Sequence, residues 1–306
     1  MLMASERPRS TRLTVVVPFA VATLIWGLTW IVIRGQLGTV PTSWSCCYRF
    51  AIAGAAMLGY AAWRRERLRL DGAGWRFAFL LGFAQFCLNY NFVYRAEAYI
   101  NSGLVAVVFA LLLVPNAILA RIFLGQRMGG QLLAGSAIAI TGVALLFAHE
   151  ARVGAGSGGR LVLGLFFATL AVLAASAANV MQATERARAY PMVPMLGVAM
   201  LIGAGLNAAY ALASAGPPVI DWRPAYLAGL AYLGLAASAL AFPLYFGVIR
   251  AIGPAKAAYS GVLVPVIAMA LSTAFEGYRW SVLAVVGSAL AVAGLVVALT
   301  ARRPVR

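Results

Sequence analysis

Long apolar segments, separated by short polar ones, follow one another along the whole chain. A helix needs about 20 mostly apolar residues to cross a bilayer, and ten segments reach about that length. A soluble fold of this size could not bury so many apolar residues. We therefore expect an all-α integral membrane protein with ten transmembrane helices. The expected helices cover residues 13–34, 42–63, 75–96, 102–123, 130–148, 161–183, 190–213, 224–249, 254–275 and 279–301.

Positively charged residues indicate how these helices are oriented. With the N-terminus in the cytoplasm, the cytoplasmic segments hold most of the 24 lysine and arginine residues, as the positive-inside rule requires. Ten spans then bring both termini to the cytoplasmic side. We expect a multi-pass protein of the plasma membrane (the inner membrane, in a bacterium). Its expected partner is the lipid bilayer.

Two similar segments indicate an internal repeat. Residues 135–142 read GSAIAITG and residues 287–294 read GSALAVAG, with five of eight positions identical. Two homologous halves of five helices each begin on opposite sides of the membrane, so they must be inverted relative to each other. Inverted repeats are typical of secondary transporters, whose substrate site lies between the halves. We expect residues 1–150 and 151–306 to form two inverted five-helix repeats around a central cavity.

Several motifs accompany this repeat. The first expected helix contains the sequence WGLTW at 26–30, the second contains Arg49-Phe50, and the fourth and ninth contain Val-Pro pairs at 114–115 and 264–265. These motifs resemble the EamA domains of the drug/metabolite transporter (DMT) superfamily, and within it the YddG-type exporters of aromatic amino acids. The family signature has a glutamate after helix four and another after helix nine. Glu276 fits the second position, whereas Gln126 replaces the first.

The resemblance implies a basket of ten helices that carries a small solute, with both termini in the cytoplasm. It also implies a central cavity lined by helices one to four and six to nine, while helices five and ten are peripheral.

Arg49 is the one charged residue well inside an expected span, about 10 Å deep at 1.5 Å per residue. A guanidinium at the centre of a membrane helix costs about 2.5–3.5 kcal/mol on insertion scales, so we expect it to face a cavity or a partner. It could bind a substrate carboxylate. Alternatively, it could reach the outer interface or pair with carbonyl groups at a helix end.

Aromatic side chains recur on one face of several expected helices. Trp26 and Trp30 are four residues apart and therefore share a face. Aromatic walls suit flat or apolar substrates, although such side chains also pack between helices or face lipid. The aromatic candidates for the substrate pathway are Trp26, Trp30, Phe86, Tyr90, Tyr94, Phe242, Tyr245 and Tyr259. By contrast, Trp44, Trp63, Trp75, Trp222 and Trp280 lie at span ends and are expected at the membrane interface.

Uncharged polar side chains inside spans form a second group of candidates. They can bind an amino-acid backbone through hydrogen bonds, or they can bridge helices, each contributing about 0.6 kcal/mol. The polar candidates for the pathway are Asn89, Asn101, Asn179, Gln182 and Ser260, and Thr29, Gln85, Asn91 and Asn116 belong to the same group.

Two prolines occupy equivalent places in the two halves, Pro115 in helix four and Pro265 in helix nine. Proline removes a helical hydrogen bond and clashes with the preceding turn, so each is expected to kink its helix. A matched pair of kinks could act as hinges for alternating opening, or each could be a static bend.

All eight carboxylates fall in loops or at the ends of expected helices. Ion-coupled carriers commonly hold a carboxylate at membrane depth, and none is expected there in this chain. Facilitated diffusion is the predicted mode of transport, with coupling through another group as the alternative.

Other functions leave no signature in the sequence. With one histidine, His149, and three cysteines in apolar segments, no metal or cofactor site is expected. No phosphate-binding motif indicates ATP hydrolysis, and no nucleophile–base pair indicates an enzyme. The net charge of +16 is spread over short clusters, which argues against nucleic acid as a partner.

The function expected from these features is secondary transport by alternating access, as an exporter or a uniporter. The expected cargo is an amino acid, aromatic or neutral, or a similar small metabolite. Carriage of drugs or sugar-linked metabolites is the alternative, and a receptor is a more remote one. The oligomeric state is left open, with a monomer among the states allowed.

Overall fold

The computed structural model describes residues 9–66, 68–125, 129–153, 158–252 and 260–299. The regular secondary structure in these ranges is helical. Six helical stretches in the described part are long and apolar enough to cross a membrane, and shorter apolar helices accompany them at Gly130–Leu146, Leu263–Phe275 and Val282–Gly294. This architecture is that of an all-helical, multi-pass membrane protein.

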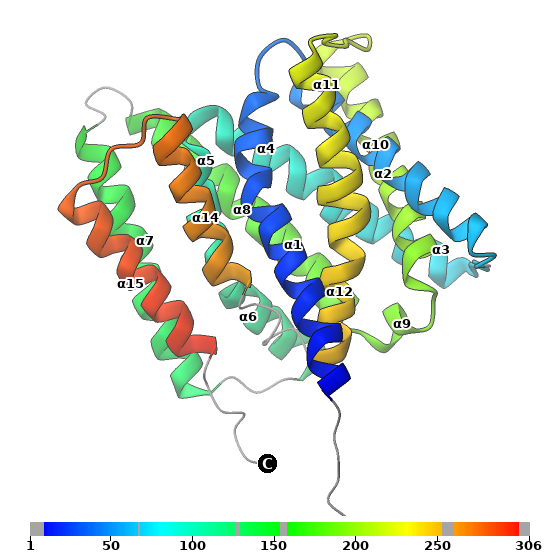
Figure 1. The fold of residues 1–306 in the computed structure, drawn as a ribbon, viewed down its shortest axis with the longest axis horizontal. Helices are drawn as coiled ribbons and strands as arrows, with labels where there is room; N and C mark the ends of the chain where they lie inside the picture. Colours follow the sequence, from blue (N-terminus) through cyan, green and yellow to red (C-terminus); the bar gives the residue numbers. More distant parts are fainter. Residues whose placement is uncertain (1–8, 67, 126–128, 154–157, 253–259, 300–306) are drawn as a thin grey trace, which may run out of the picture.

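Figure 1 shows these helices packed side by side in one bundle. The label η denotes a π-helix, in which hydrogen bonds join residues five apart. In chain order the helices are α1 (Arg9–Gly35), α2 (Thr42–Trp63), α3 (Gly72–Leu81), η1 (Gly82–Asn89), α4 (Tyr90–Tyr99), α5 (Ser102–Ala110), α6 (Leu113–Leu124), α7 (Gly130–Val153), α8 (Gly158–Gln182), α9 (Glu185–Arg188), α10 (Met192–Ala215), α11 (Pro224–Ala231), η2 (Tyr232–Leu240), α12 (Ala241–Ile252), α14 (Ser260–Phe275) and α15 (Val282–Leu299).

The same irregularity occurs once in each half of the chain. In the first half, α3 widens into η1 and continues as α4, and in the second half α11 widens into η2 and continues as α12. Pro41 and Pro191 likewise precede α2 and α10. Because π-helices are rare, their recurrence at matching positions indicates that the two halves share one arrangement of helices.

Helices α7 and α15, which carry the repeated glycine motif, pack against each other at one edge of the bundle (Figure 1). A Cβ atom on Gly142 would lie 2.3 Å from the backbone nitrogen of Ala291, and one on Gly294 would lie 2.3 Å from that of Ala139. These contacts run in opposite directions along the two helices, so the pair is antiparallel. Small residues let helix backbones approach closely in lipid, where van der Waals packing drives association.

Helices α2 and α10 form a second antiparallel pair. A Cβ on Gly54 would lie 2.9 Å from the carbonyl oxygen of Gly197, and the indole of Trp44, near the other end of α2, donates to the carbonyl of Gly216. Trp44 is only 4% exposed. The prediction that it lies at the membrane interface is therefore wrong, because the end of α10 covers it. The four other tryptophans predicted at the interface are exposed: Trp63, Trp75, Trp222 and Trp280.

The two matched prolines have different effects on their helices. Pro115 has no N–H to offer the carbonyl of Leu111, four residues earlier, and Val114 donates to that carbonyl instead, at 2.9 Å. The chain is broken there into α5 and α6. In contrast, α14 runs without a break past Pro265. The expected symmetric pair of hinges is thus asymmetric, with a helix break only beside Pro115.

The bundle has two ends that matter for the site. At the end drawn uppermost in Figure 1, called the upper end here, α1, α4 and α14 finish and α5 and α11 begin. At the opposite, lower end, the described part of α1 begins and that of α15 finishes.

Asp71 connects the two halves through a side-chain hydrogen bond. Its Oδ1 accepts from the Gly74 amide at 2.8 Å, which caps α3, and from the Tyr190 hydroxyl at 2.6 Å. The hydrogen bond from Tyr190, followed by that from Gly74, lowers the pKa of the Asp71 carboxyl. Asp71 therefore stabilises the fold at neutral pH, and this contribution is lost as the pH falls through the lowered pKa.

We expect Asp71→Ala to lower the thermal unfolding temperature of the detergent-solubilised protein at pH 7, because a helix cap and a bridge between the halves are both lost. Asp71→Asn keeps an acceptor oxygen and should fall between the wild type and Asp71→Ala. Acidification should reduce the difference in unfolding temperature between the wild type and Asp71→Asn. A difference that stays constant down to pH 3 would contradict the stabilising role of the Asp71 charge.

Candidate functional site

A cavity of about 140 Å³ lies between the two halves. Its walls come from α1, η1, α4, α5 and α6 of the first half and from α8, α12 and α14 of the second. Concave, largely apolar cavities with a few polar groups are the usual form of small-molecule sites. This cavity is the candidate site. The residues that line it are Trp26, Thr29, Trp30, Ile33, Gln85, Asn89, Tyr90, Val93, Ala106, Phe109, Ala110, Leu112, Leu113, Asn116, Ala175, Asn179, Phe242, Tyr245, Ser260, Gly261, Val264 and Pro265.

Aromatic rings from both halves meet at Trp26. Its indole lies edge-on to Phe242, with 5.4 Å between ring centroids, and to Tyr245, at 4.8 Å. The indole nitrogen donates to the carbonyl of Ala237 at 3.1 Å. Ala237 belongs to η2. The wider turns of a π-helix change the hydrogen-bond pattern of its backbone, so that a carbonyl can accept from a side chain of another helix. Trp26 is thus held in a fixed position between the halves, with part of its ring on the cavity.

Two polar atoms on the cavity wall lack a protein partner. The indole nitrogen of Trp30 and the Oδ1 atom of Asn116 are buried and make no hydrogen bond in the described part of the chain. One is a donor and the other an acceptor. Leaving a buried polar group unpaired costs about 1–3 kcal/mol, so these atoms are suited to bind a polar group that enters the cavity.

Most of the predicted pathway residues lie together on this cavity. The structure places Trp26, Trp30, Asn89, Tyr90, Asn179, Phe242, Tyr245 and Ser260 on its wall, with Pro265 beside them. Asn89 is partly engaged, because its side chain donates to the carbonyl of Ala171 and accepts from Gln85. A role of these residues in transport stays a prediction.

Other predicted residues lie elsewhere. Phe86 is buried behind the wall, where its ring contacts Phe242 at 5.3 Å and Phe50 at 5.1 Å. Tyr94 is also buried, and its hydroxyl donates to Gln36. Three more residues are off the cavity: Asn101 precedes α5 at the upper end, Gln182 is buried at the end of α8, and Pro115 follows the helix break. Tyr259 and Gln126 lie outside the described residues.

The lining also differs from what the family resemblance implies for the second and seventh helices. No described residue of α2 or α10 is on the wall. On α2, the ring of Phe50 packs against that of Tyr90, which is on the wall, with 4.8 Å between centroids. Helices α7 and α15, the fifth and tenth, lie at one edge of the bundle as implied (Figure 1), and none of their described residues is on the wall.

Arg49 is fully buried and does not reach the membrane interface, so that alternative is wrong. Its Nε donates to the hydroxyl of Ser238 in η2 at 2.9 Å, and its guanidinium lies 4.2 Å from the centroid of the Tyr90 ring. The hydrogen bond from its Nε goes to a hydroxyl, and no hydrogen bond from Arg49 to a helix-end carbonyl is found among the described residues. Arg49 stands behind the cavity wall, in contact with one of the residues that form it.

Side chains of both halves are connected at the upper end. The guanidinium of Arg34, at the end of α1, donates to the backbone carbonyl of Glu97 and lies 3.9 Å from the carboxylate of Glu276. That carboxylate also accepts from the hydroxyl of Ser272 and, at 3.2 Å, from the amide of Ser102. Since Glu276 follows α14 and Ser102 begins α5, this network links the second half to the first at the upper end.

The carboxylate of Glu97 is completely buried, and both of its oxygens lack a hydrogen-bond partner in the described residues. Its place at the end of α4 agrees with the sequence. The carboxylate is nevertheless buried where the sequence predicted none, because helices packed around the end of α4 exclude water from it. The prediction of facilitated diffusion assumed that no carboxylate is buried, and Glu97 does not meet that assumption.

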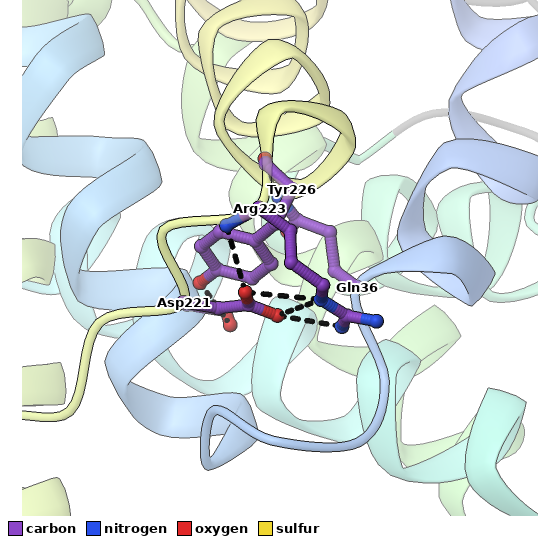
Figure 2. A network of polar contacts seen from close by, with 5 residues as sticks. Gln36, Asp221, Arg223 and Tyr226 are labelled. Atoms are coloured by element: carbon purple, nitrogen blue, oxygen red, sulfur yellow. Dashed lines mark hydrogen bonds and ion pairs between the residues drawn. The ribbon is translucent and has the colours of Figure 1, made fainter.

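A further polar network lies at the start of α11 (Figure 2). Gln36 donates to the backbone carbonyl of Tyr226, and the Tyr226 hydroxyl is 2.8 Å from that of Ser45. In the adjoining loop, Arg223 donates to both carboxylate oxygens of Asp221, and these hydrogen bonds lower the pKa of that carboxyl. Asp221 therefore stays ionised and holds the loop where α11 begins.

One aromatic residue of the wall was missed by the sequence. Phe109 contacts Trp30 with 5.0 Å between ring centroids and lines the cavity. It lies in a segment, residues 103–114, that is apolar on all sides. Without a polar face, such a helix gives no indication of which side is turned toward the cavity.

Comparisons with known proteins agree with this architecture. The chain is 26% identical to Protein PagO of Salmonella typhimurium over 271 residues, 88% of either chain. It is 28% identical over 211 residues to a protein of Streptantibioticus cattleyicolor named "probable terminal-alkyne amino-acid exporter", with 65% of this chain and 64% of that one covered. A solved crystal structure superimposes with a TM-score of 0.69 at 20% identity, over 94% of this chain and 97% of that chain, which shows a shared fold.

The family comparison covers almost all of the helical part. The EamA-like transporter family matches the sequence twice, at residues 14–148 and at residues 162–300. These ranges include the WGLTW sequence, both Val-Pro pairs and both copies of the glycine motif. Members of this family are membrane carriers and not enzymes. The chain belongs to the EamA-like transporter family.

Proposed function

We propose that this membrane transporter moves amino acids, aromatic or neutral ones, or similar small metabolites by alternating access, as an exporter or a uniporter. The observation that carries the proposal is the lining of the cavity. Its wall combines aromatic rings with uncharged polar groups, and no ionised side chain of the described residues is part of it. Such a wall suits a solute with an apolar or aromatic body and a few hydrogen-bonding groups.

The proposed architecture has ten spans in two inverted halves, residues 1–150 and 151–306, with both termini in the cytoplasm of a bacterial cell. The antiparallel packing of α7 on α15 and of α2 on α10 supports this arrangement, because equivalent helices of inverted repeats must run in opposite directions. In this orientation the upper end faces outward. The network of Arg34, Ser102, Ser272 and Glu276 then closes the external side, and the described conformation is the one closed to the outside.

The relative from Streptantibioticus cattleyicolor supports amino acids as the cargo, since it is named for amino-acid export. Carriage of cationic drugs is the rival within the same family. The absence of a carboxylate from the described lining argues against it, because a cation in a largely apolar cavity needs an anionic partner.

The test is transport by the purified protein in proteoliposomes, with radiolabelled phenylalanine, tryptophan and threonine. We expect saturable flux of at least one of them, and counterflow when unlabelled substrate is loaded on the opposite side. Protein that is folded by gel filtration but gives no saturable flux of any amino acid would contradict the proposed cargo.

Replacing Trp26 with alanine is expected to weaken transport about tenfold, because the ring joins Phe242 and Tyr245 on the wall and edge-to-face ring contacts contribute about 0.5–1.5 kcal/mol each. The concentration dependence of flux measures the effect. Trp63→Ala is the matched control, since Trp63 is 76% exposed and remote from the cavity. Equal flux in the two variants would remove Trp26 from the pathway.

A further inference from the structure

Arg49 has an environment that is unusual for a charged residue. Its side chain is fully buried, and its atoms Nη1 and Nη2 have no hydrogen-bond partner of normal geometry in the described residues. No carboxylate of the described residues lies within 4.0 Å of its nitrogen atoms. The ion pairs among the described residues are Arg34–Glu276 and Asp221–Arg223, and neither includes Arg49. The guanidinium is therefore a buried cation without a carboxylate in ion-pair contact.

A buried charge without a counter-charge is expensive. The effective penalty for burying an ion is several kcal/mol, and only an ion pair with further hydrogen bonds offsets it. The contacts that Arg49 does make offset part of this penalty: the Tyr90 ring at 4.2 Å, the Phe50 ring at 5.3 Å and one hydroxyl. Cation–π contacts contribute about 0.5–2 kcal/mol. An anion that reached Arg49 would therefore find a strong site.

The orientation of the guanidinium is fixed. Ser238 accepts from Nε, and its own hydroxyl donates to the carbonyl of Leu233, five residues earlier in η2. On the other side, Tyr90 directly follows η1. Arg49 is thus held between the two π-helical segments, with Nε occupied and the two Nη atoms left over. A pair of parallel N–H groups is the arrangement that binds a carboxylate in a bidentate manner.

Tyr90 stands between this cation and the cavity. Its ring contacts the guanidinium, and the same residue is part of the cavity wall. Arg49 itself is not on the wall. Tyr90 is therefore in contact with both the cavity and the buried cation.

We propose that Arg49 is a concealed carboxylate-binding site covered by Tyr90, and that the transported solute carries a carboxylate which displaces the Tyr90 ring from the guanidinium. This inference rests on the proposed function, which it makes more specific. The cargo is then a monocarboxylate with an apolar or aromatic body. The aromatic rings at Trp26, Trp30 and Phe109 contact the body, and the polar groups of the wall contact any neutral substituent.

The groups around the site agree with this assignment. Glu97 is near enough to interact electrostatically with Arg49, but its carboxylate forms no hydrogen bond or ion pair with it. Tyr94, on the same helix as Tyr90, lies beside the guanidinium and is directed to Gln36. No described acidic group therefore occupies the place of the substrate carboxylate.

Ligand binding by the full chain in detergent tests the proposal. The probes are 3-phenylpropionate and its uncharged counterpart 3-phenylpropanamide, which differ only in the carboxylate. We expect the wild type to bind the acid about tenfold or more tightly than the amide. In Arg49→Met the ratio of acid affinity to amide affinity should fall to near one. In Arg49→Lys it should be intermediate, because lysine keeps the positive charge but not the paired N–H groups of the guanidinium. Tyr90→Ala should strengthen binding of the acid, since its site is uncovered.

Arg49→Met is suitable because methionine fills a similar volume and leaves no buried charge, so the variant is expected to fold. The ratio of acid to amide binding is compared within each variant, which makes it insensitive to a general loss of stability. An unchanged ratio in Arg49→Met overturns the proposal. If Arg49→Met abolishes discrimination while proteoliposomes carry no amino acid, the carboxylate site stands and the proposed cargo fails. If amino acids are carried but the ratio is unchanged, only the carboxylate site fails.

Discussion

A disulfide between cysteines introduced at Gly103 and Ser272 is expected to stop transport almost completely, and a reducing agent is expected to restore it. A Cβ on Gly103 would lie 3.0 Å from the Cβ of Ser272, which is closer than the range of about 3.5–4.5 Å found in disulfides, so the two helices must move slightly apart for the bond to form. The thioether of Met269, 2.7 Å from the same position, can move aside because its chain is flexible. The bond would join α5 of the first half to α14 of the second at the upper end.

The expected size of the effect follows from alternating access. If solute leaves through the upper end, α5 and α14 must separate once in every cycle, and a covalent bond between them prevents it. We expect counterflow of the labelled substrate to fall at least tenfold under oxidation. The cross-link should leave ligand binding to the cavity intact, since Gly103 and Ser272 are not on its wall.

The three free cysteines, Cys46, Cys47 and Cys87, are first replaced by alanine. Each single-cysteine variant then serves as a control, because it experiences the same oxidant without forming the bond. Full flux in quantitatively cross-linked protein would show that the upper end does not open and would remove it from the proposed pathway.

The positions of several helices could be read from the sequence because lipid imposes a length on each apolar segment, although six stretches of the described residues, not ten, are long and apolar enough to span a membrane. The expected helix 42–63 coincides with α2, and the expected segment 102–123 covers α5 and α6. The break between α5 and α6 could also be predicted, because Pro115 has no N–H to donate to the carbonyl of Leu111. These features depend on local chemistry, for which the residues themselves are sufficient.

The π-helices explain one error within the site. A period of 3.6 residues places Phe86, Asn89 and Tyr90 on one face, and all three were expected on the pathway. The wider turns of η1 change this relation, so that Asn89 and Tyr90 line the cavity while Phe86 packs behind it against Phe50. A single sequence gave no sign of η1, because its composition resembles that of the flanking helices.

Burial of charge was the other feature that could not be predicted. Glu97 is near a helix end, where a side chain usually reaches water, yet the surrounding helices bury it completely. Arg49 was recognised as a charge inside a span, but its contacts with Ser238 and Tyr90 join segments far apart in the chain. Such environments arise from tertiary packing, which the pattern of residues within one segment does not reveal.

Replacing Gly142 with leucine is expected to prevent α7 from packing on α15. The added Cβ alone would lie 2.3 Å from the nitrogen of Ala291 and 2.5 Å from the carbonyl oxygen of Gly287, far below van der Waals contact. Backbone atoms cannot rotate away as a side chain can. Overpacking usually costs about 1–3 kcal/mol, and a clash between two backbones should reach or exceed the upper limit. Thermal unfolding and the monodisperse fraction in gel filtration measure the loss.

Gly205 provides the matched control, because nothing lies within 4 Å of a Cβ placed there. Gly205→Leu should behave like the wild type. A Gly142→Leu variant with an unchanged unfolding temperature would mean that α7 and α15 are not in contact in the membrane protein.

The symmetry of the contact gives a sharper form of the same prediction. A Cβ on Gly287 would lie 2.7 Å from the carbonyl oxygen of Gly142, so each glycine is the neighbour into which the other's side chain would project. Gly142→Leu and Gly287→Leu should therefore cause similar losses. Once either variant has forced the helices apart, the second substitution meets less resistance, and the double variant should lose less than the two single losses added together. Strictly additive losses would indicate two independent sites and would contradict the packing of one glycine motif on its repeat.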